Sequence, residues 1–215
     1  MTIWTDERGL SLFLLLLVGW VFVAPLLLPR TGEGNLLGDL FFSVLLLTGA
    51  TAVPMKRGAR ALVIGVAVLG AGLRIIEGFW QPGVAGPARL AFFALSSTFL
   101  ALILLIRVFA GGKVNQHRIL GAVSVYLLIG VTWATVYALV EKIHPGSFAL
   151  SGAIGDRRDW IYYSLVALTT TGFGDITPIH PVARTLTVFE TLIGQLYPAI
   201  LIARLVSQAF TPPSR

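Results

Sequence analysis

The chain has no cysteine among its 215 residues, and only 12% of those residues are charged. The lack of cysteine excludes disulfide frameworks, thiolate metal sites and a cysteine nucleophile. The shortage of charge accompanies a hydrophobic fraction of 56% and a mean hydropathy of +0.84. Water alone cannot keep a chain of this composition soluble, so we expect an integral membrane protein.

The charges that are present are mainly basic, with 16 Lys and Arg against 10 Asp and Glu. Such an excess can indicate a nucleic-acid partner, but here the basic residues lie at the ends of apolar runs rather than in one stripe. That distribution is typical of membrane topology, in which short cytoplasmic loops are rich in Lys and Arg. We therefore expect membrane lipid, and no nucleic acid, around this chain.

Six apolar runs are long enough to cross a hydrocarbon core of about 30 Å, which takes about 20 helical residues. They cover approximately residues 10 to 28, 36 to 53, 60 to 78, 88 to 109, 119 to 140 and 182 to 208. Basic residues follow the second and fourth runs: Lys56, Arg57, Arg60, Arg107, Lys113 and Arg118. They mark the cytoplasmic side, so we expect a multi-pass protein of the cell membrane, plasma or inner, with both termini in the cytoplasm.

A seventh apolar segment, residues 160 to 168, has about half the length needed to cross. We expect a re-entrant helix that enters the membrane and returns to the same side, with Asp159 capping its first turn and its end near Thr169. The negative end of its dipole, directed toward the membrane centre, favours a cation. Backbone without helical bonds persists at that depth only where protein or a water-filled cavity surrounds it.

The sequence TTTGFGD, residues 169 to 175, follows this helix. Gly172 and Gly174 can adopt positive φ, and alternating backbone handedness turns successive carbonyls the same way. Such a row of oxygens, closed at its inner end by the Thr170 hydroxyl, can replace the hydration shell of a monovalent cation. The side chains of Thr171 and Phe173 would then point away from the axis as a packed cuff. Asp175 would lie at the outer mouth.

This motif resembles the potassium-channel signature, together with the aromatic-rich helix before it and Pro178 and an apolar helix after it. The similarity covers about residues 119 to 208, and the six-span layout resembles the voltage-gated-like superfamily. It implies an all-α integral membrane fold of six transmembrane helices, a re-entrant pore helix and an extended selectivity filter, in a homotetrameric pore with three further copies as partners. It also implies an atypical, sensor-like four-helix membrane domain over residues 1 to 117. A pore domain of outer helix, turret, pore helix, filter and inner helix would then cover residues 118 to 215.

The resemblance implies a potassium-selective channel that conducts K⁺ passively and has no cofactor, K⁺ being the permeant ion. The ion-binding residues it implies are Thr170, Thr171, Gly172, Phe173 and Gly174, with K⁺ at the first four. Val and Tyr are commoner at positions 171 and 173, so we expect Tyr162, Tyr163 and Asp175 to support the filter and its mouth.

Two alternatives remain open, a weakly selective monovalent cation channel and a membrane subunit related to K⁺ transporters. An ordinary glycine turn would leave the half-length helix unexplained. No paired carboxylates, Ser/His/Asp arrangement or phosphate loop indicates an enzyme.

The last apolar run contains Gly194 and, four residues later, Pro198. Proline cannot donate a hydrogen bond to the carbonyl four residues before it, so we expect a bend at this pair that serves as the gate hinge or as a fixed splay. Close packing against a neighbour is the alternative reading of Gly194. By resemblance, Thr191, Gln195, Pro198 and Ile202 line the cavity.

Two further features concern charge inside the apolar runs. An acid such as Glu190 is costly within a span, and its position favours a structural hydrogen bond toward the outer or pore helix over an ion site. A voltage sensor needs several regularly spaced arginines, but the fourth run has only Arg89 and Arg107, at opposite ends. We therefore expect little voltage dependence.

Overall fold

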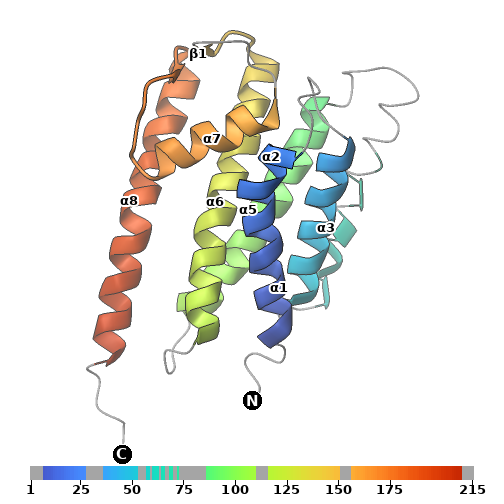
Figure 1. Cartoon of the computed structure of the whole chain (residues 1–215), viewed down its shortest axis with the longest axis vertical. Helices are drawn as coiled ribbons and strands as arrows, with labels where there is room; N and C mark the ends of the chain where they lie inside the picture. Colours follow the sequence, from blue (N-terminus) through green and yellow to red (C-terminus); the bar gives the residue numbers. More distant parts are fainter. Residues whose placement is uncertain are drawn as a thin grey trace, which may run out of the picture.

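The computed structural model of the chain describes residues 7–27, 36–52, 86–109, 116–150 and 156–209, with short helical pieces at 57–58, 60–62, 64–65, 68–69 and 72. The long helices lie side by side, and one short helix, α7, crosses them near one end (Figure 1). The elements in chain order are α1 (Glu7–Val18), η1 (Gly19–Val23), α2 (Ala24–Leu27), α3 (Leu36–Ala52), α5 (Gly86–Phe109), α6 (Gln116–Ile143), β1 (Phe148–Leu150), α7 (Arg157–Leu168), β2 (Ile176–Pro178) and α8 (Pro181–Ala209).

Four of the described helices are long and apolar enough to cross a membrane. They are Gly9–Leu27, Gly86–Phe109, Arg118–Ile143 and Pro181–Arg204, which confirms the predicted first, fourth, fifth and sixth spans. The second predicted span is a helix of 17 residues, α3. Most of the third, 60 to 78, lies outside the described residues. Helix α1 begins and helix α8 ends at the same end of the bundle (Figure 1).

The helices pack through apolar side chains that they bury against one another. The buried side chains of each helix lie on one face because residues three and four apart share that face. Fully buried members include Phe13 of α1, Leu45 of α3, Leu100 of α5 and Leu128 of α6. A Cβ atom at Gly49 of α3 would overlap the side chains of Leu100 and Phe13, so this glycine allows three helices to approach closely.

Two arginines hold the carboxyl end of α5. Arg118 of α6 donates to the Val108 carbonyl from Nε at 3.1 Å and from Nη2 at 2.8 Å. Arg204 of α8 donates from Nη2 to the Phe109 carbonyl at 2.8 Å. The last carbonyls of a helix have no partner within it, so these bonds satisfy them and tie α5 to both helices of the predicted pore domain.

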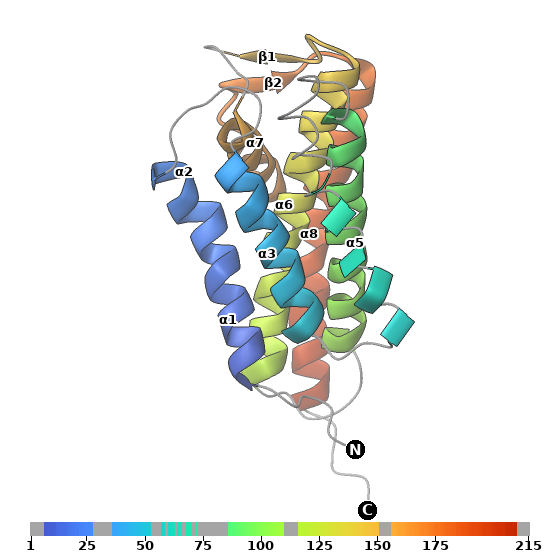
Figure 2. The same cartoon turned by 90° about the vertical axis from the view of Figure 1, so that its right-hand side faces the viewer.

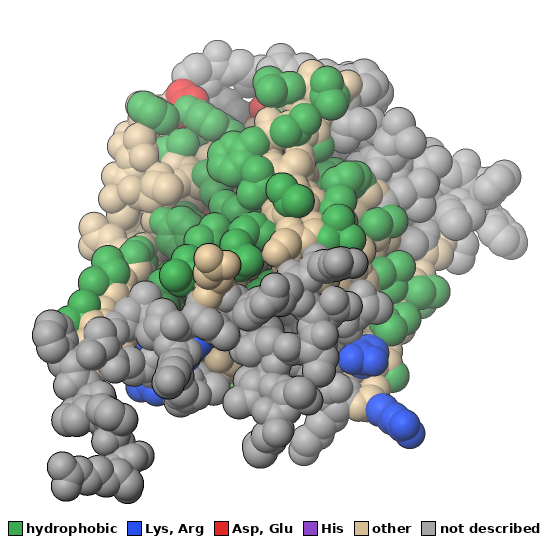
Figure 3. Space-filling model, turned by 60° about the horizontal axis from the view of Figure 1, so that its bottom comes forward, with side chains coloured by type: hydrophobic (Ala, Val, Ile, Leu, Met, Phe, Trp, Pro, Cys, Tyr) green, Lys and Arg blue, Asp and Glu red, His purple; other side chains and the backbone are tan. Residues whose placement is uncertain are grey.

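The surface of the bundle is strongly apolar. Hydrophobic side chains cover the faces of the helices, and basic side chains lie toward the lower end, which Figure 3 brings forward. Large exposed side chains occur on every long described helix, including Leu15, Val44, Ile106, Ile119 and Phe189. A surface of this kind is stable in lipid rather than water, so the chain is a multi-pass membrane protein.

Candidate functional site

The short helix α7 begins three residues earlier than the sequence suggested. Its N-cap is Asp156, with extended backbone at φ −102° and ψ 146°, and the Asp156 carbonyl accepts the Asp159 N–H at 3.1 Å. The prediction that Asp159 caps the helix is therefore wrong, because the first turn already includes Arg157 and Arg158. Asp159 lies within that turn, where its charge still favours the positive end of the helix dipole.

The other end of α7 lies where the sequence placed it. The last helical residue is Leu168 and Thr169 is the C-cap. The Thr169 N–H donates to the Leu165 carbonyl and the Thr171 N–H donates to the Val166 carbonyl, both at 2.9 Å. These bonds satisfy late carbonyls of the helix while the chain turns out of it into the filter sequence.

The filter sequence has alternating backbone handedness. Thr170, Gly172 and Gly174 have φ of 60°, 60° and 80°, whereas Thr171 and Phe173 have negative φ. Positive φ at both glycines confirms that prediction. Positive φ at a β-branched threonine was not anticipated, and it is a strained conformation that recurs at functional sites. The sequence argument predicts that such alternation turns successive peptide carbonyls toward one side, and this role as a row of oxygen ligands stays a prediction.

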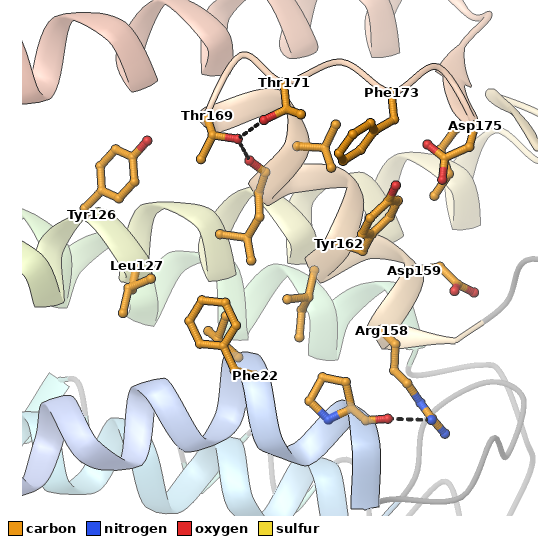
Figure 4. Close-up of a pocket in the computed structure, with 16 residues that line it drawn as sticks. Phe22, Tyr126, Leu127, Arg158, Asp159, Tyr162, Thr169, Thr171, Phe173 and Asp175 are labelled. Atoms are coloured by element: carbon orange, nitrogen blue, oxygen red, sulfur yellow. Dashed lines mark hydrogen bonds between the residues drawn. The ribbon is translucent and has the colours of Figure 1, made fainter.

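The side chains of the filter sequence contact the pore helix. Figure 4 shows Phe173 beside Tyr162, and their rings stack at 6.5 Å between centroids with 3° between planes. A hydrogen bond between the Tyr162 hydroxyl and the Asp175 carboxylate raises the pKa of Tyr162. Thr171 pairs its hydroxyl with that of Thr169 at 2.8 Å. Tyr162 thus supplies a hydroxyl next to a phenylalanine that has none.

Tyr163, predicted with Tyr162 as a filter support, faces the opposite way. Its hydroxyl lies 2.7 Å from Thr187 Oγ1 of α8, and its ring meets the Tyr137 ring edge-on at 4.9 Å. Successive residues of a helix point about 100° apart, so only one of the two tyrosines can face the filter strand. Tyr163 instead joins the pore helix to the outer and inner helices.

Helix α8 passes directly over the end of the pore helix. A Cβ atom at Gly194 would overlap the backbone carbonyl oxygen of Leu168, and Thr191 Oγ1 lies 3.3 Å from the Ala167 carbonyl oxygen. This contact supports the close-packing role of Gly194, whereas its role as a hinge stays a prediction. Pro198 lies inside an uninterrupted α8, and the predicted cavity residues Gln195 and Ile202 are exposed in the single chain.

Glu190 lies at the meeting point of three helices. Its side chain is 0% exposed, with Oε2 2.5 Å from the Tyr137 hydroxyl of α6 and Oε1 2.5 Å from Ser164 Oγ of α7. The predicted structural hydrogen bond is confirmed. Its partners could not be identified from the sequence, because they are 53 and 26 residues away along the chain.

The segment after the filter sequence has a brace that the sequence did not indicate. Strands β1 and β2 pair antiparallel, with Phe148 opposite Pro178 and Leu150 opposite Ile176. The Ser147 carbonyl accepts the N–H of Ile179 at 2.8 Å and that of His180 at 3.1 Å. This brace holds the segment after the filter against the end of α6. Within the described part of the chain no three His, Cys, Asp or Glu residues cluster as metal ligands.

Comparisons with known proteins address the same region. A family model described as ion channel matches residues 123–211. Protein LctB from Bacillus caldotenax is 30% identical over 107 residues, which are 47% of this chain and 79% of LctB. The two pore potassium channel c of Oryza sativa subsp. japonica is 39% identical over 83 residues, or 38% of this chain. The chain belongs to the potassium channel family.

A further relative, the inward rectifier potassium channel Kirbac3.1 of Paramagnetospirillum magnetotacticum, is 32% identical over 95 residues, or 42% of this chain. The chain spans only 17% of the rice channel and 29% of Kirbac3.1. No solved structure matches it significantly. The family match begins within α6 and includes α7, the filter strand and α8, so the segment that identifies this channel is the one with the geometry described above.

Proposed function

We propose that the chain is a subunit of a potassium-selective channel, in which four copies surround one pore that conducts K⁺ passively. The observation that carries this proposal is the alternation of positive and negative φ from Thr170 to Gly174. It directs a row of carbonyls to one side, and oxygen rings of this kind replace the water around a dehydrated cation. K⁺ would bind at Thr170, Thr171, Gly172 and Phe173.

The number of filter strands supports an assembly of copies. One strand cannot surround an ion, and the sequence contains a single TTTGFGD motif. In the single chain, all residues from Thr169 to Gly174 are exposed, and Phe173 is 69% exposed. A cavity of about 900 Å³ lies behind Thr171 and Phe173, with Phe22 and Tyr126 on its far walls (Figure 4). The filter strand is thus only partly covered by its own chain, as expected if neighbouring copies complete its surroundings.

The proposed topology has six spans with both termini in the cytoplasm, a four-helix domain over residues 1–117 and a pore domain over 118–215. Helix α3 ends and helix α5 begins at opposite ends of the bundle (Figure 2), which supports a further crossing between them. Arg118 bonds the Val108 carbonyl, and Arg204, near the end of α8, bonds the Phe109 carbonyl. Arg107 and Arg118 therefore lie toward the end at which α8 finishes, and basic residues favour the cytoplasmic side. The filter would then open toward the outside.

A potassium flux assay tests this function. The full-length protein in liposomes should give barium-blockable K⁺ flux, and Gly172→Ala should abolish it. A Cβ at Gly172 meets no atom of its own chain within 4 Å, so within one subunit the substitution acts through the φ of +60°, which costs about 1–2 kcal/mol for an L residue. Gly19→Ala is the matched control, because Gly19 also has no neighbour within 4 Å but has helical backbone. Persistent flux in Gly172→Ala would refute the proposed filter.

A weakly selective monovalent cation channel is the second candidate, because Phe173 lacks the hydroxyl that the commoner tyrosine provides. The Tyr162 hydroxyl, bound to Asp175, is the local replacement. Reversal potentials in mixed potassium and sodium separate the two candidates. A reversal potential that follows the K⁺ gradient supports selectivity, and one near zero supports the alternative. A subunit related to K⁺ transporters would give no single-channel currents in a planar bilayer.

A further inference from the structure

We propose that Glu190 is an uncharged carboxylic acid that donates its proton to Ser164 and thereby positions the inner helix against the pore helix. Glu190 lies in the middle of α8, Ser164 in α7 and a third partner, Tyr137, in α6. The protonation state follows from the contacts alone. The consequence for conduction rests on the proposed potassium-channel function.

The surroundings of Glu190 disfavour a charge. The side chain is 0% exposed, and no Lys, Arg or His of the described residues forms an ion pair with it. The titratable groups near it are the hydroxyls of Tyr126 and Tyr137 on α6 and of Tyr163 on α7, none of which is cationic. An unpaired carboxylate in such a place carries a large desolvation cost, which a neutral acid avoids.

The number of protons available to the hydrogen bonds around Glu190 also indicates a neutral carboxylic acid. Ser164 Oγ lies 2.7 Å from the Gly130 carbonyl oxygen and 2.5 Å from Glu190 Oε1. Ser164 Oγ has a single proton for these two acceptor oxygens. If that proton goes to the Gly130 carbonyl, the contact with Glu190 Oε1 takes its proton from the carboxyl group. Tyr137 donates to the other oxygen, Oε2, at 2.5 Å. An ionised Glu190 would leave two of these acceptor oxygens facing each other without a proton.

Neighbouring hydroxyls cannot supply the missing proton. Thr187 Oγ1 donates to the Ala183 carbonyl at 2.8 Å, so the 2.7 Å contact between Thr187 and Tyr163 takes the proton of Tyr163. Both hydroxyls nearest to the site are therefore already used. The carboxyl group of Glu190 is the remaining source, and all the oxygens of the cluster are then satisfied.

The bond has a clear mechanical role. It joins α8 to α7 one turn before Gly194, where the two backbones touch, and Ser164 passes the connection on to Gly130 of α6. The neutral acid thus fixes the separation of the inner helix and the pore helix one helical turn from their backbone contact at Gly194. Because α7 leads directly into the filter strand, Glu190 is a positioning residue for the filter.

Infrared spectroscopy of the purified full-length protein tests the protonation state. We expect a C=O stretch of a protonated carboxylic acid at pH 7, where a free glutamate is ionised, and we expect that band to be absent in Glu190→Gln. Ser164→Ala should shift that band to higher frequency, because the acid loses its acceptor. Absence of the band in the wild type, or an unchanged band in Glu190→Gln, would overturn the proposal.

Paired substitutions test the positioning role. Glutamine can donate N–H to Ser164 and accept from Tyr137, so Glu190→Gln should keep thermal stability and K⁺ flux within about twofold of wild type. Glu190→Leu, which leaves Tyr137 unsatisfied, should lose both. Equal loss in the two variants would contradict the proposal. An acid band without K⁺ flux would refute only the channel function, and flux without the band would refute only this inference.

Discussion

Thr170 has the least expected backbone conformation of the described residues, with a φ of 60° at a β-branched residue. Glycine at this position would adopt the same φ without strain, but it would remove the hydroxyl that closes the row of carbonyls. The presence of threonine therefore favours a role for the hydroxyl as an ion ligand at the inner end of the filter.

Two substitutions of Thr170 separate the effect of its hydroxyl on K⁺ flux from the effect of its backbone. Thr170→Ser keeps the hydroxyl and should retain K⁺ flux. Thr170→Ala loses an oxygen ligand to a charged ion, worth about 1.5–3 kcal/mol, so flux should fall about tenfold or more. Liposome flux at matched protein content measures both, and equal flux in the two variants would show that the hydroxyl binds no ion.

The pair of Tyr162 and Asp175 predicts a response to alkaline pH. The bond raises the pKa of Tyr162, so the stabilisation it gives is complete below the ordinary tyrosine pKa of about 10 and is lost as pH rises further. Tyr162 is 39% exposed, so solvent screening limits the effect to about 1 kcal/mol or less.

Tyr162→Phe keeps the ring stacked on Phe173 and removes the hydroxyl. We expect wild-type flux to decline at a pH above about 10 and the variant to show a lower flux without that additional decline. Flux measured against external pH in both proteins decides this, and an identical alkaline decline in the variant would assign it to another group.

At the scale of the elements, the contribution of Arg118 to holding the carboxyl end of α5 can be tested by substitution. Arg118 makes two bonds to the Val108 carbonyl from a buried position. Arg118→Met should lower the free energy of unfolding by about 1–3 kcal/mol, because a buried carbonyl loses its charged donor. Thermal unfolding in detergent measures the change, and Arg57→Met, at an exposed arginine, is the control. Equal losses of stability in Arg118→Met and Arg57→Met would show that the bonds of Arg118 add no stability.

Much of the element order could be predicted from the sequence, because apolar length alone distinguishes spanning helices from the half-length α7. The C-terminal end of α7 and the positive φ of Gly172 were also predictable, since both follow from local chemistry. The start of α7 was not, because Arg157 and Arg158 look like loop residues although they lie in the first helical turn. Arg158 is held there by long-range contact, donating from Nη1 to the Pro25 carbonyl at 2.7 Å.

Features that depend on distant parts of the chain could not be predicted. The partners of Glu190 and the pairing of β1 with β2 join segments that are 26 or more residues apart. The π-helical turn η1 places Trp20 under the Arg157 guanidinium, 5.2 Å from the ring centroid, and no local pattern indicates it. Local propensity determines whether a helix forms, whereas packing determines which residues meet.

At the scale of the molecule, helices α1 and α5 lie against α6 of the same chain. Thr132 of α6 donates to Ser97 of α5 at 3.0 Å, and the start of α7 contacts Trp20 of η1 and Pro25 of α2. Six residues, 110–115, link α5 to α6, and they reach about 20 Å at most. We therefore expect each four-helix domain to stay with its own pore domain in the tetramer.

The same domain should respond weakly to voltage. Arg89 and Arg107 lie near opposite ends of α5, whereas a sensor moves several charges, each worth about 2.3 kcal/mol per 100 mV. Conductance should change little between about −100 and +100 mV. A steep activation curve in planar-bilayer recordings, equivalent to several gating charges, would refute this expectation.

The most direct measurement is an experimental structure of the purified assembly in potassium and in thallium, whose scattering identifies bound ions. Our account predicts four chains around one axis, with ion density between the main-chain oxygens of residues 170 to 174. Filter carbonyls turned away from the axis, or a strand enclosed within one subunit and far from any shared axis, would contradict it.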